Sequence, residues 1–266
     1  MVEVLVLLGY GWVAAAATMV VLWLVQRRTG NAGIVDVGWA AITGTLAVLY
    51  GLLGGGELPR RLLLAALGAA WGWRLAWHLG RDRVWRRPEE GRYLTLRRNW
   101  SPHAGRAFFV FFQAQALAAV VLSLPFALAA QAAAAFPAAS DLAALALVAV
   151  GVAGETIADR QLLDFKRNPG NRGRTCRAGL WRYSRHPNYF FEWILWCGFG
   201  VLGLASPWGW TGFVAPLVIL SSIVFVTGIP PTEAQALASR GDDYRAYQRT
   251  TSAFVPWPPR RDKGGG

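Results

Sequence analysis

The sequence predicts an all-α polytopic membrane protein with seven transmembrane helices. Apolar stretches close to twenty residues long recur along the 266-residue chain, and 54% of its residues are hydrophobic. A helix needs about 20 mainly apolar residues to cross the hydrocarbon core of a bilayer. The arginines gather in alternate intervals between these stretches. Length, composition and charge placement therefore favour membrane helices over the core of a soluble domain.

Polar or glycine-rich sequence closes each expected span. The first stretch stops at Gln26-Arg27-Arg28, and Gly54-Gly55-Gly56 follows the second. Asp141 is the expected N-cap of the fifth. Pro187 begins the sixth, because proline suits the first turn of a helix and disfavours helical geometry in the residue before it. The expected spans cover about Val4–Val25, Gly33–Leu53, Leu62–Leu79, Ala107–Ala130, a stretch from Asp141 that turns polar at Glu155, Asn188–Leu204, and Trp210–Ile229.

The C-terminal part is expected to leave the membrane. Pro230-Pro231 ends the last apolar stretch, and the residues from Thr232 to Thr251 have the composition of a polar amphipathic helix. Because no linker divides the spans, we expect one domain over residues 1–259. Residues 260–266, which end in three glycines, are expected to form a disordered tail.

The formal charge of +12 is explained by membrane topology. In a seven-span chain with its N-terminus outside, the cytoplasmic pieces are Arg27–Asn31, Arg81–Arg106, Arg160–Pro187 and the C-terminal tail. These pieces hold nearly all the arginines outside the spans, as the excess of basic residues in cytoplasmic loops requires. No nucleic-acid recognition pattern is visible. Cys176 and Cys197 have no metal-ligand spacing, so no metal site is predicted.

A basic segment with polar and aromatic residues enters the sixth span without a spacer. Such groups at membrane depth mark a functional site by default, and a helix N-terminus suits an anion. The preceding loop adds arginines, which bind phosphate bidentately, and glycines, which let backbone N–H groups approach an anion. A solvated loop facing anionic headgroups is the alternative. The candidate residues here are Lys166, Asn171, Arg174, Trp181, Arg182, Tyr183, Arg185, His186, Asn188 and Tyr189.

Other polar residues mark the cytoplasmic side. Glu155 and Asp159 lie four residues apart and share one helical face, either in a polar network or as charge balance at a helix exit. Asp36 lies within the second apolar stretch and therefore needs a partner or a raised pKa. Two interpretations of Asp36 remain open: a proton donor, or a structural partner of Arg74. Tyr93 is either a proton donor or an interfacial aromatic residue.

The residues after the last span offer a further contact to a nucleotide. Arg240, Tyr244 and Tyr247 can stack on a purine ring and bind phosphate. An amphipathic helix lying on the membrane surface is the competing interpretation. The chain has neither a GxGxxG motif after a strand nor a P-loop, so a nucleotide would bind in another way.

Four motifs together resemble the bacterial membrane proteins grouped with steroid 5-alpha-reductases. They are IVDVGWA, GRYLTLRRNW, NPGNRGRTCRAGLWRYSRHPNYFFE and IPPTEAQALASRGDDYRAYQRTTSAFVPWPP, and the resemblance covers about Asn31 to Pro259. The RHPNY core also resembles the cofactor segment of C14 sterol reductases and of isoprenylcysteine carboxyl methyltransferases. The resemblance implies a helical fold in the bacterial inner membrane, with a cofactor pocket on the cytoplasmic side.

The resemblance to the reductases implies NADPH as the cofactor and a lipid-soluble enone as the substrate, whose conjugated C=C bond is reduced. It also implies that membrane lipids surround the protein. It implies Asp36 and Tyr93 as groups that polarise the enone carbonyl. The implied NADPH-binding residues are those of the basic segment, with Glu155 and Asp159 before it and Arg240, Tyr244 and Tyr247 after it.

Two alternatives to the reductase remain. An isoprenylcysteine-type methyltransferase would bind S-adenosylmethionine and carry a Glu-Glu pair after the last span, where this chain has Thr232-Glu233. A non-catalytic membrane protein of the same fold would bind neither cofactor. The many cations suit a cofactor with several phosphates, so the sequence favours the reductase.

Overall fold

Helix ends follow the signals in the sequence. In the computed structural model, which describes residues 1–260, α1 (Val2–Thr29) closes with Gly30 in the left-handed conformation at φ 72°, and the Gly30 N–H donates to the Gln26 carbonyl. α2 (Ile34–Leu53) ends before the predicted glycines, and α8 (Pro187–Gly203) begins at Pro187 as predicted. Residues 261–266, which the sequence assigned to a disordered tail, lie outside the described residues.

The chain forms two compact units, each described by itself. One comprises Met1–Leu142 with Gly200–Ala215, and the other comprises Ala143–Phe199 with the chain from Pro216 onward. The expectation of one domain over residues 1–259 stays a prediction.

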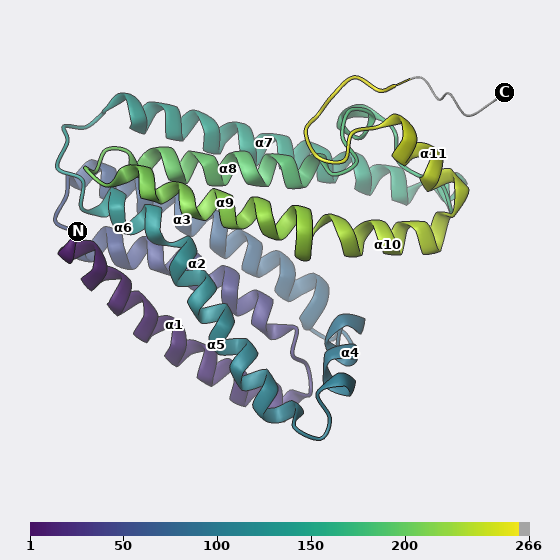
Figure 1. Ribbon diagram of the computed structural model, residues 1–266, viewed down its shortest axis with the longest axis horizontal. Helices are drawn as coiled ribbons and strands as arrows, with labels where there is room; N and C mark the ends of the chain where they lie inside the picture. The colour runs from purple at the N-terminus through teal and green to yellow at the C-terminus, as the bar shows by residue number, and fades with distance from the viewer. Residues whose placement is uncertain (261–266) are drawn as a thin grey trace. The chain divides into compact units, whose positions relative to one another are not determined.

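In the first unit, small residues bring α2 and α3 (Leu58–Leu79) into close contact (Figure 1). A Cβ placed on Gly72 would lie 2.6 Å from the Gly44 Cα, and one on Gly68 would lie 2.2 Å from the Ala47 Cβ. Such stripes of small residues are typical of packed membrane helices, because they allow the backbones to approach and gain van der Waals contact. The contact fixes α2, which carries Asp36.

The expected span over Ala107–Ala130 is two helices. α5 (Ala104–Leu122) ends at Ser123, and α6 (Leu124–Ala130) starts there with Pro125 in its first turn. Proline lacks the N–H that a continuous helix needs, so the break falls just before it. The polar region 81–106, for which the sequence analysis predicted no helix, includes most of the short π-helix η1 (Gly80–Val84) and all of α4 (Gly91–Asn99).

A buried ion pair joins the start of α3 to the start of α7 (Ala139–Arg167). Arg60 donates from Nε and Nη2 to the two carboxylate oxygens of Asp141, each at 2.7 Å, and the two side chains are 0% and 1% exposed. Arg60 also donates to carbonyls in the 132–135 link. Asp141 was predicted as the N-cap, but α7 begins two residues earlier, at Ala139. The Asp141 carboxylate accepts hydrogen bonds from the Ala138 N–H and from Arg60.

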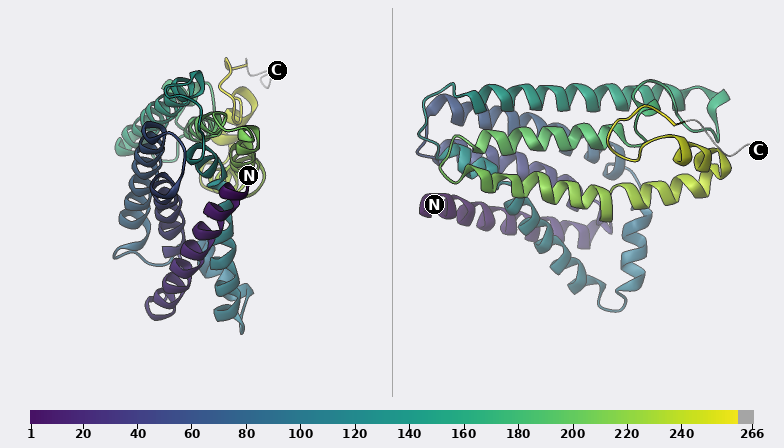
Figure 2. Two further views of the ribbon diagram at one scale, coloured as in Figure 1. Left: turned by 90° about the vertical axis from the view of Figure 1, so that its left-hand side faces the viewer. Right: turned by 45° about the horizontal axis from the view of Figure 1, so that its top comes forward.

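The second unit is a set of long helices that run side by side (Figures 1 and 2). α7 and α8 lie along a segment made of α9 (Val214–Ser221), the π-helix η5 (Ser222–Val226) and α10 (Ile229–Arg240). The expected amphipathic helix Thr232–Thr251 is divided at Gly241, where φ is +53°, into α10 and α11 (Asp242–Thr250). Two single turns, η2 (Pro169–Asn171) and η3 (Gly179–Arg182), shape the basic loop.

Within residues 1–260, five helical segments are long and apolar enough to cross a membrane. They are Val2–Thr29, Ile34–Leu53, Ala104–Leu122, Ala139–Arg167 and Gly209–Arg240, the last of which includes the 3-10 turn η4 (Gly209–Phe213). The other two expected spans correspond to α3, which carries Arg60, Arg61 and Arg74, and to α8, which has 17 residues. Seven spans are therefore not established, and the coarser prediction of a helical membrane protein stands.

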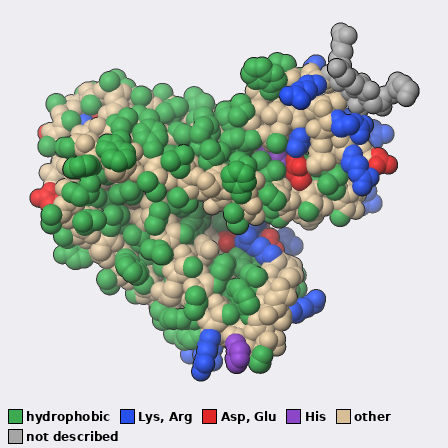
Figure 3. Space-filling view, in the orientation of Figure 1, with side chains coloured by type: hydrophobic (Ala, Val, Ile, Leu, Met, Phe, Trp, Pro, Cys, Tyr) green, Lys and Arg blue, Asp and Glu red, His purple; other side chains and the backbone are tan. Residues whose placement is uncertain are grey.

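The surface of the helices agrees with a lipid environment. Large apolar side chains on the helix surfaces are well exposed: Val13 is 72% exposed, Val110 66%, Leu217 60% and Phe225 75%. The space-filling view shows apolar side chains over the long faces of the helices, while Lys and Arg gather near helix ends (Figure 3). Contact with hydrocarbon removes the cost that water would impose on these side chains.

Candidate functional site

The start of α8 is tied to the C-terminal segment by backbone and side-chain hydrogen bonds. The Arg185 N–H donates to the Ser252 carbonyl at 2.8 Å, and the Ser184 hydroxyl donates to the Phe254 carbonyl at 2.7 Å. Ser184 Oγ also accepts the His186 N–H, which lies immediately before the helix. The segment that enters α8 is therefore fixed by residues near the end of the chain.

Glu233, in the first turns of α10, accepts hydrogen bonds from several directions. Its Oε1 accepts from Arg185 Nε at 2.7 Å and from the Tyr244 hydroxyl at 3.3 Å, and lies 3.2 Å from His186 Nε2. Its Oε2 accepts from Gln248 Nε2 at 2.6 Å. Arg185 also donates to the carbonyls of residues 248 and 251. One carboxylate thereby joins α8, α10 and α11.

Buried aromatic residues surround this carboxylate. The Tyr247 hydroxyl donates to the carbonyls of Trp181 and Ser184, and Trp181 Nε1 donates to the Ala158 carbonyl at 2.9 Å. Burial, with the Glu233 carboxylate nearby, raises the pKa of Tyr244 to about 12. Tyr244 is therefore protonated at neutral pH and acts as a hydrogen-bond donor.

A cavity of about 310 Å³ opens among these residues at the N-terminus of α8. Thr175 and Cys176 form part of its wall; the Thr175 hydroxyl is buried without a hydrogen-bond partner among the described residues. A buried polar group of this kind is costly unless something satisfies it, so it is available to a ligand. Burial raises the pKa of the Cys176 thiol. The cavity thus combines aromatic faces, cations and one unsatisfied hydroxyl.

A second cavity, of about 300 Å³, adjoins the first and is strongly basic. The two share Leu162, Lys166, Cys176, Ser239 and Arg240 in their walls. The second adds cations and amides from the basic loop, including Gly173 at φ +73°. The residues specific to it are Phe165, Asn171, Arg172, Gly173 and Arg174.

The structure brings most of the predicted cofactor residues together. Nine line the first cavity: Lys166, Trp181, Arg185, His186, Asn188, Tyr189, Arg240, Tyr244 and Tyr247. Asn171 and Arg174 line the second. Glu155, Asp159, Arg182 and Tyr183 line neither, although Asp159 accepts from the Asn188 amide at 3.2 Å. The helix α7 continues to Arg167, so Glu155 and Asp159 precede the part of it that reaches the cavities.

The sequence analysis missed several residues of this site. Glu233, the shared acceptor, entered only as half of a Glu-Glu pair, Cys176 was considered only as a metal ligand, and Thr175 and Gln248 were not considered. The available signal was Glu233 itself, an isolated carboxylate two residues after Pro231 at the end of a long apolar stretch, because a lone acid there needs a cationic or hydrogen-bonding partner.

In the first unit, Asp36 and Tyr93 form a hydrogen-bonded pair. The Tyr93 hydroxyl donates to Asp36 Oδ1 at 2.8 Å, and Arg92 forms an ion pair with the other carboxylate oxygen. Burial, followed by the nearby Asp36 carboxylate, raises the pKa of Tyr93. Asp36 acts as acceptor for both neighbours, so the hydrogen-bond donor of the pair is Tyr93. The sequence analysis considered Arg74, and not Arg92, as the partner.

A neighbouring ion pair holds α4 against the α1–α2 link. Glu89 accepts from Arg97 at 2.8 Å and from the Ala32 N–H at 2.7 Å. Arg97 also donates to the Gly30 carbonyl at 3.2 Å. These contacts fix α4, and with it the position of the Tyr93 hydroxyl beside α2.

The fold and these sites define an all-helical integral membrane protein with a basic and aromatic cavity at one helix N-terminus. The chain belongs to the family described as "Protein of unknown function (DUF1295)", whose model matches residues 22–251. No curated protein and no solved structure matches the chain.

Proposed function

We propose that the protein is a membrane-embedded, NADPH-dependent reductase of a conjugated C=C bond in a steroid-like or other lipid-soluble enone. The observation that carries the proposal is the pair of adjoining cavities in the second unit, one aromatic and one basic. Planar rings pack on aromatic side chains, and arginine binds phosphate bidentately, so the pair suits a dinucleotide with several phosphates.

Particular residues support each half of this cofactor site. His186 and Tyr189 stack with ring centroids 5.4 Å apart, and the Arg240 guanidinium lies 5.3 Å from the Tyr244 ring centroid. Arg172 and Arg174 extend the positive charge into the second cavity. The Thr175 hydroxyl, buried without a partner among the described residues, adds a hydrogen-bonding group to the first cavity.

Tyr93 and Asp36 support the substrate half of the proposal. Bound NADPH would supply a hydride to the β-carbon of the enone. Tyr93 would turn its single O–H from Asp36 to the carbonyl oxygen of the enone, where negative charge develops. Arg92, which pairs with Asp36 and donates to the Tyr93 oxygen, would hold the hydroxyl in place. The α-carbon then takes up a proton, which leaves the saturated ketone.

The proposal includes seven spans in a bacterial inner membrane, with α3 and α8 added to the five long apolar helices. The N-terminus would lie outside, and the basic loops and the cofactor cavities would face the cytoplasm. The arginine-rich segments 81–106 and 160–187 support this orientation. The 17 residues of α8 are at the short end of what crosses a bilayer.

The test is mass spectrometry of the nucleotide released from protein purified in mild detergent, with titrations of NADPH and S-adenosylmethionine. We expect NADP(H) near stoichiometry. Lys166→Ala and Arg240→Ala should each weaken NADPH about ten- to a hundredfold, since a hydrogen bond to a charged group contributes about 1.5–3 kcal/mol. The matched control is Arg245→Ala, an exposed arginine of α11 paired with Asp242.

Other outcomes would contradict the reductase. Bound S-adenosylmethionine, or its demethylated product, would assign the site to methyl transfer. Binding of neither cofactor would leave a non-catalytic membrane protein.

A further inference from the structure

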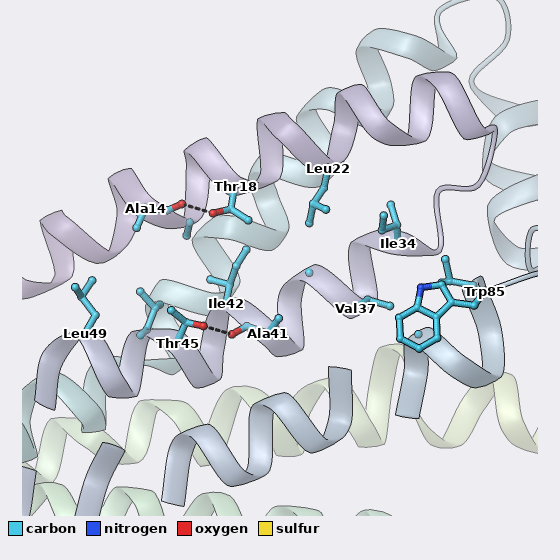
Figure 4. A pocket seen from close by; sticks show the side chains of 15 residues that line it. Ala14, Thr18, Leu22, Ile34, Val37, Ala41, Ile42, Thr45, Leu49 and Trp85 are labelled. Atoms are coloured by element: carbon cyan, nitrogen blue, oxygen red, sulfur yellow. Dashed lines mark hydrogen bonds between the residues drawn. The ribbon is translucent and has the colours of Figure 1, made fainter. Parts of the chain in front are cut away.

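An apolar groove of about 420 Å³ lies between α1 and α2, and Trp85 lies at the end of the groove near Ile34 and Val37 (Figure 4). The Trp85 ring folds back over Gly80, 3.5 Å from where a Cβ on that glycine would lie. The two helices approach closely where Leu22 packs on Gly38, and small side chains at Ala14 and Ala41 leave space beside this contact.

The walls of the groove are mostly hydrocarbon, and their two threonine hydroxyls have no hydrogen-bond donor left for a ligand. Thr18 donates to the Ala14 carbonyl and Thr45 to the Ala41 carbonyl, each at 2.8 Å, so both hydroxyls are satisfied within their own helices (Figure 4). The remaining walls are alanine, leucine, isoleucine and valine side chains, together with Gly38, Gly80 and the ring of Trp85. A ligand of this groove is therefore held by apolar contact.

The groove is long and narrow. It follows α2 from Ile34 to Leu49, and the 15 rises between these residues, at about 1.5 Å each, give about 22 Å. A volume of about 420 Å³ spread over that length suits a linear hydrocarbon chain better than a compact ring system. Residues 34, 38, 41 and 45 share one face of α2, whereas Asp36 lies on the opposite face. The groove is thus separate from the Asp36–Tyr93 pair.

Positive charge gathers at the Trp85 end. Residues 81–87 contain four arginines and one aspartate, and Arg86 and Arg87 are exposed. The Asn31 amide donates to the Arg87 carbonyl at 3.4 Å, which keeps this segment beside the α1–α2 link where the groove ends. Tryptophan prefers the boundary between hydrocarbon and headgroups, and arginines there attract anionic lipid.

We propose that the groove binds one acyl chain of an anionic phospholipid, whose phosphate lies against Arg86 and Arg87. The acyl chain fills the space between α1 and α2 and gains van der Waals contact there. The charge complementarity at the Trp85 end selects the anionic headgroup. This site goes beyond the proposed reductase and does not depend on nucleotide binding.

The experiment is native mass spectrometry of the full chain in mild detergent, titrated with phosphatidylglycerol or with phosphatidylcholine of the same acyl chains. We expect one tightly held phosphatidylglycerol. Ala14→Trp should fill the groove and weaken both lipids about tenfold or more, since each buried methylene contributes to binding. The matched control is Val13→Trp, whose side chain is 72% exposed and does not line the groove.

The headgroup is tested separately. Arg86→Gln with Arg87→Gln should lower the affinity for phosphatidylglycerol to that for phosphatidylcholine, while Arg98→Gln with Arg106→Gln should not. Ala41→Phe fills the groove from α2 and replaces Ala14→Trp if that variant does not fold. Unchanged lipid retention in both filled variants would overturn the proposal. So would equal losses in Val13→Trp, or a dimer of the wild type that Ala14→Trp dissociates, because a second copy would then occupy the groove.

Discussion

Glu233 is the residue on which the geometry of the first cavity depends most, because it contacts Arg185, His186 and Tyr244 in the cavity wall. It is 14% exposed and pairs with Arg185, which is 11% exposed. Removing one partner of a buried ion pair leaves an uncompensated charge and costs about 3 kcal/mol or more. We expect Glu233→Ala to lower thermal stability in detergent and to abolish nucleotide binding. The control is Asp242→Ala, since Asp242 is 94% exposed and its ion pair contributes little. Equal effects of the two substitutions would contradict this role.

Arg185 is a poor test of nucleotide binding for the same reason. Its Nε and Nη1 atoms already donate to Glu233 and to the carbonyls of residues 248 and 251. Substituting it would disturb the cavity whether or not a nucleotide contacts it. Lys166 and Arg240, which line both cavities, separate the two effects.

Tyr93→Phe tests the proposed carbonyl donor. The substitution removes one hydroxyl and keeps the ring, so the packing of α4 should persist. Loss of a donor to a developing oxyanion costs about 10²–10³ in turnover. We expect the turnover number for an enone that the wild type reduces to fall by this factor, while the affinity for NADPH stays unchanged. Asp36→Asn should lower turnover in the same direction because it removes the ion-pair partner of Arg92, which donates to the Tyr93 oxygen. Full activity in Tyr93→Phe would rule out the assigned role.

Cys176 reports on the cavity through its reactivity. Burial raises the pKa of its thiol, so little thiolate is present at neutral pH and alkylation by a maleimide should be slow. Below the pKa, the rate should rise about tenfold per pH unit with the thiolate fraction. In a Cys197→Ala background, NADPH should slow the reaction further. The same rate with and without saturating NADPH would place the nucleotide elsewhere.

At the scale of elements, the Arg60–Asp141 pair determines how the α3 start and the α7 start are held together. Both side chains are buried, and Arg60 also binds carbonyls of the 132–135 link. Asp141→Ala would leave the arginine unpaired and should cost about 3–5 kcal/mol. The measurement is the unfolding temperature in detergent. Arg60→Met combined with Asp141→Leu should recover much of the loss, because an apolar pair of similar volume avoids the buried charge.

At the scale of the whole molecule, the number of spans decides which side the arginine-rich segment 81–106 faces. If α3 crosses the membrane, residues 57 and 86 lie on opposite sides; if it does not, they lie on the same side. We expect opposite sides. The measurement is labelling of Glu57→Cys and Arg86→Cys, each in a background without Cys176 and Cys197, by an impermeant maleimide in intact cells and after lysis. Labelling of both positions from one side would leave α3 outside the set of spans.

The amino-acid sequence by itself determined the helical membrane class and several helix ends, such as those at Gly30, Gly54 and Pro187. These follow from local properties: long apolar stretches, the capping glycine at Gly30, and the proline that starts α8. The sequence also located the basic loop whose residues line the two cavities. The seven spans predicted from the sequence exceed the five candidate spans in residues 1–260, because α3 carries three arginines and α8 is short.

Only the tertiary structure decided the contacts between residues distant in the chain. Tyr93 bonds to Asp36 across 57 positions, and Arg185 bonds to Glu233 across 48. Local pattern fixes the type and face of a helix, whereas the partner of a polar side chain depends on which helices pack together and in which register. For that reason Arg92 was missed as the partner of Asp36, and Glu233 as the shared acceptor of Arg185, Tyr244 and Gln248.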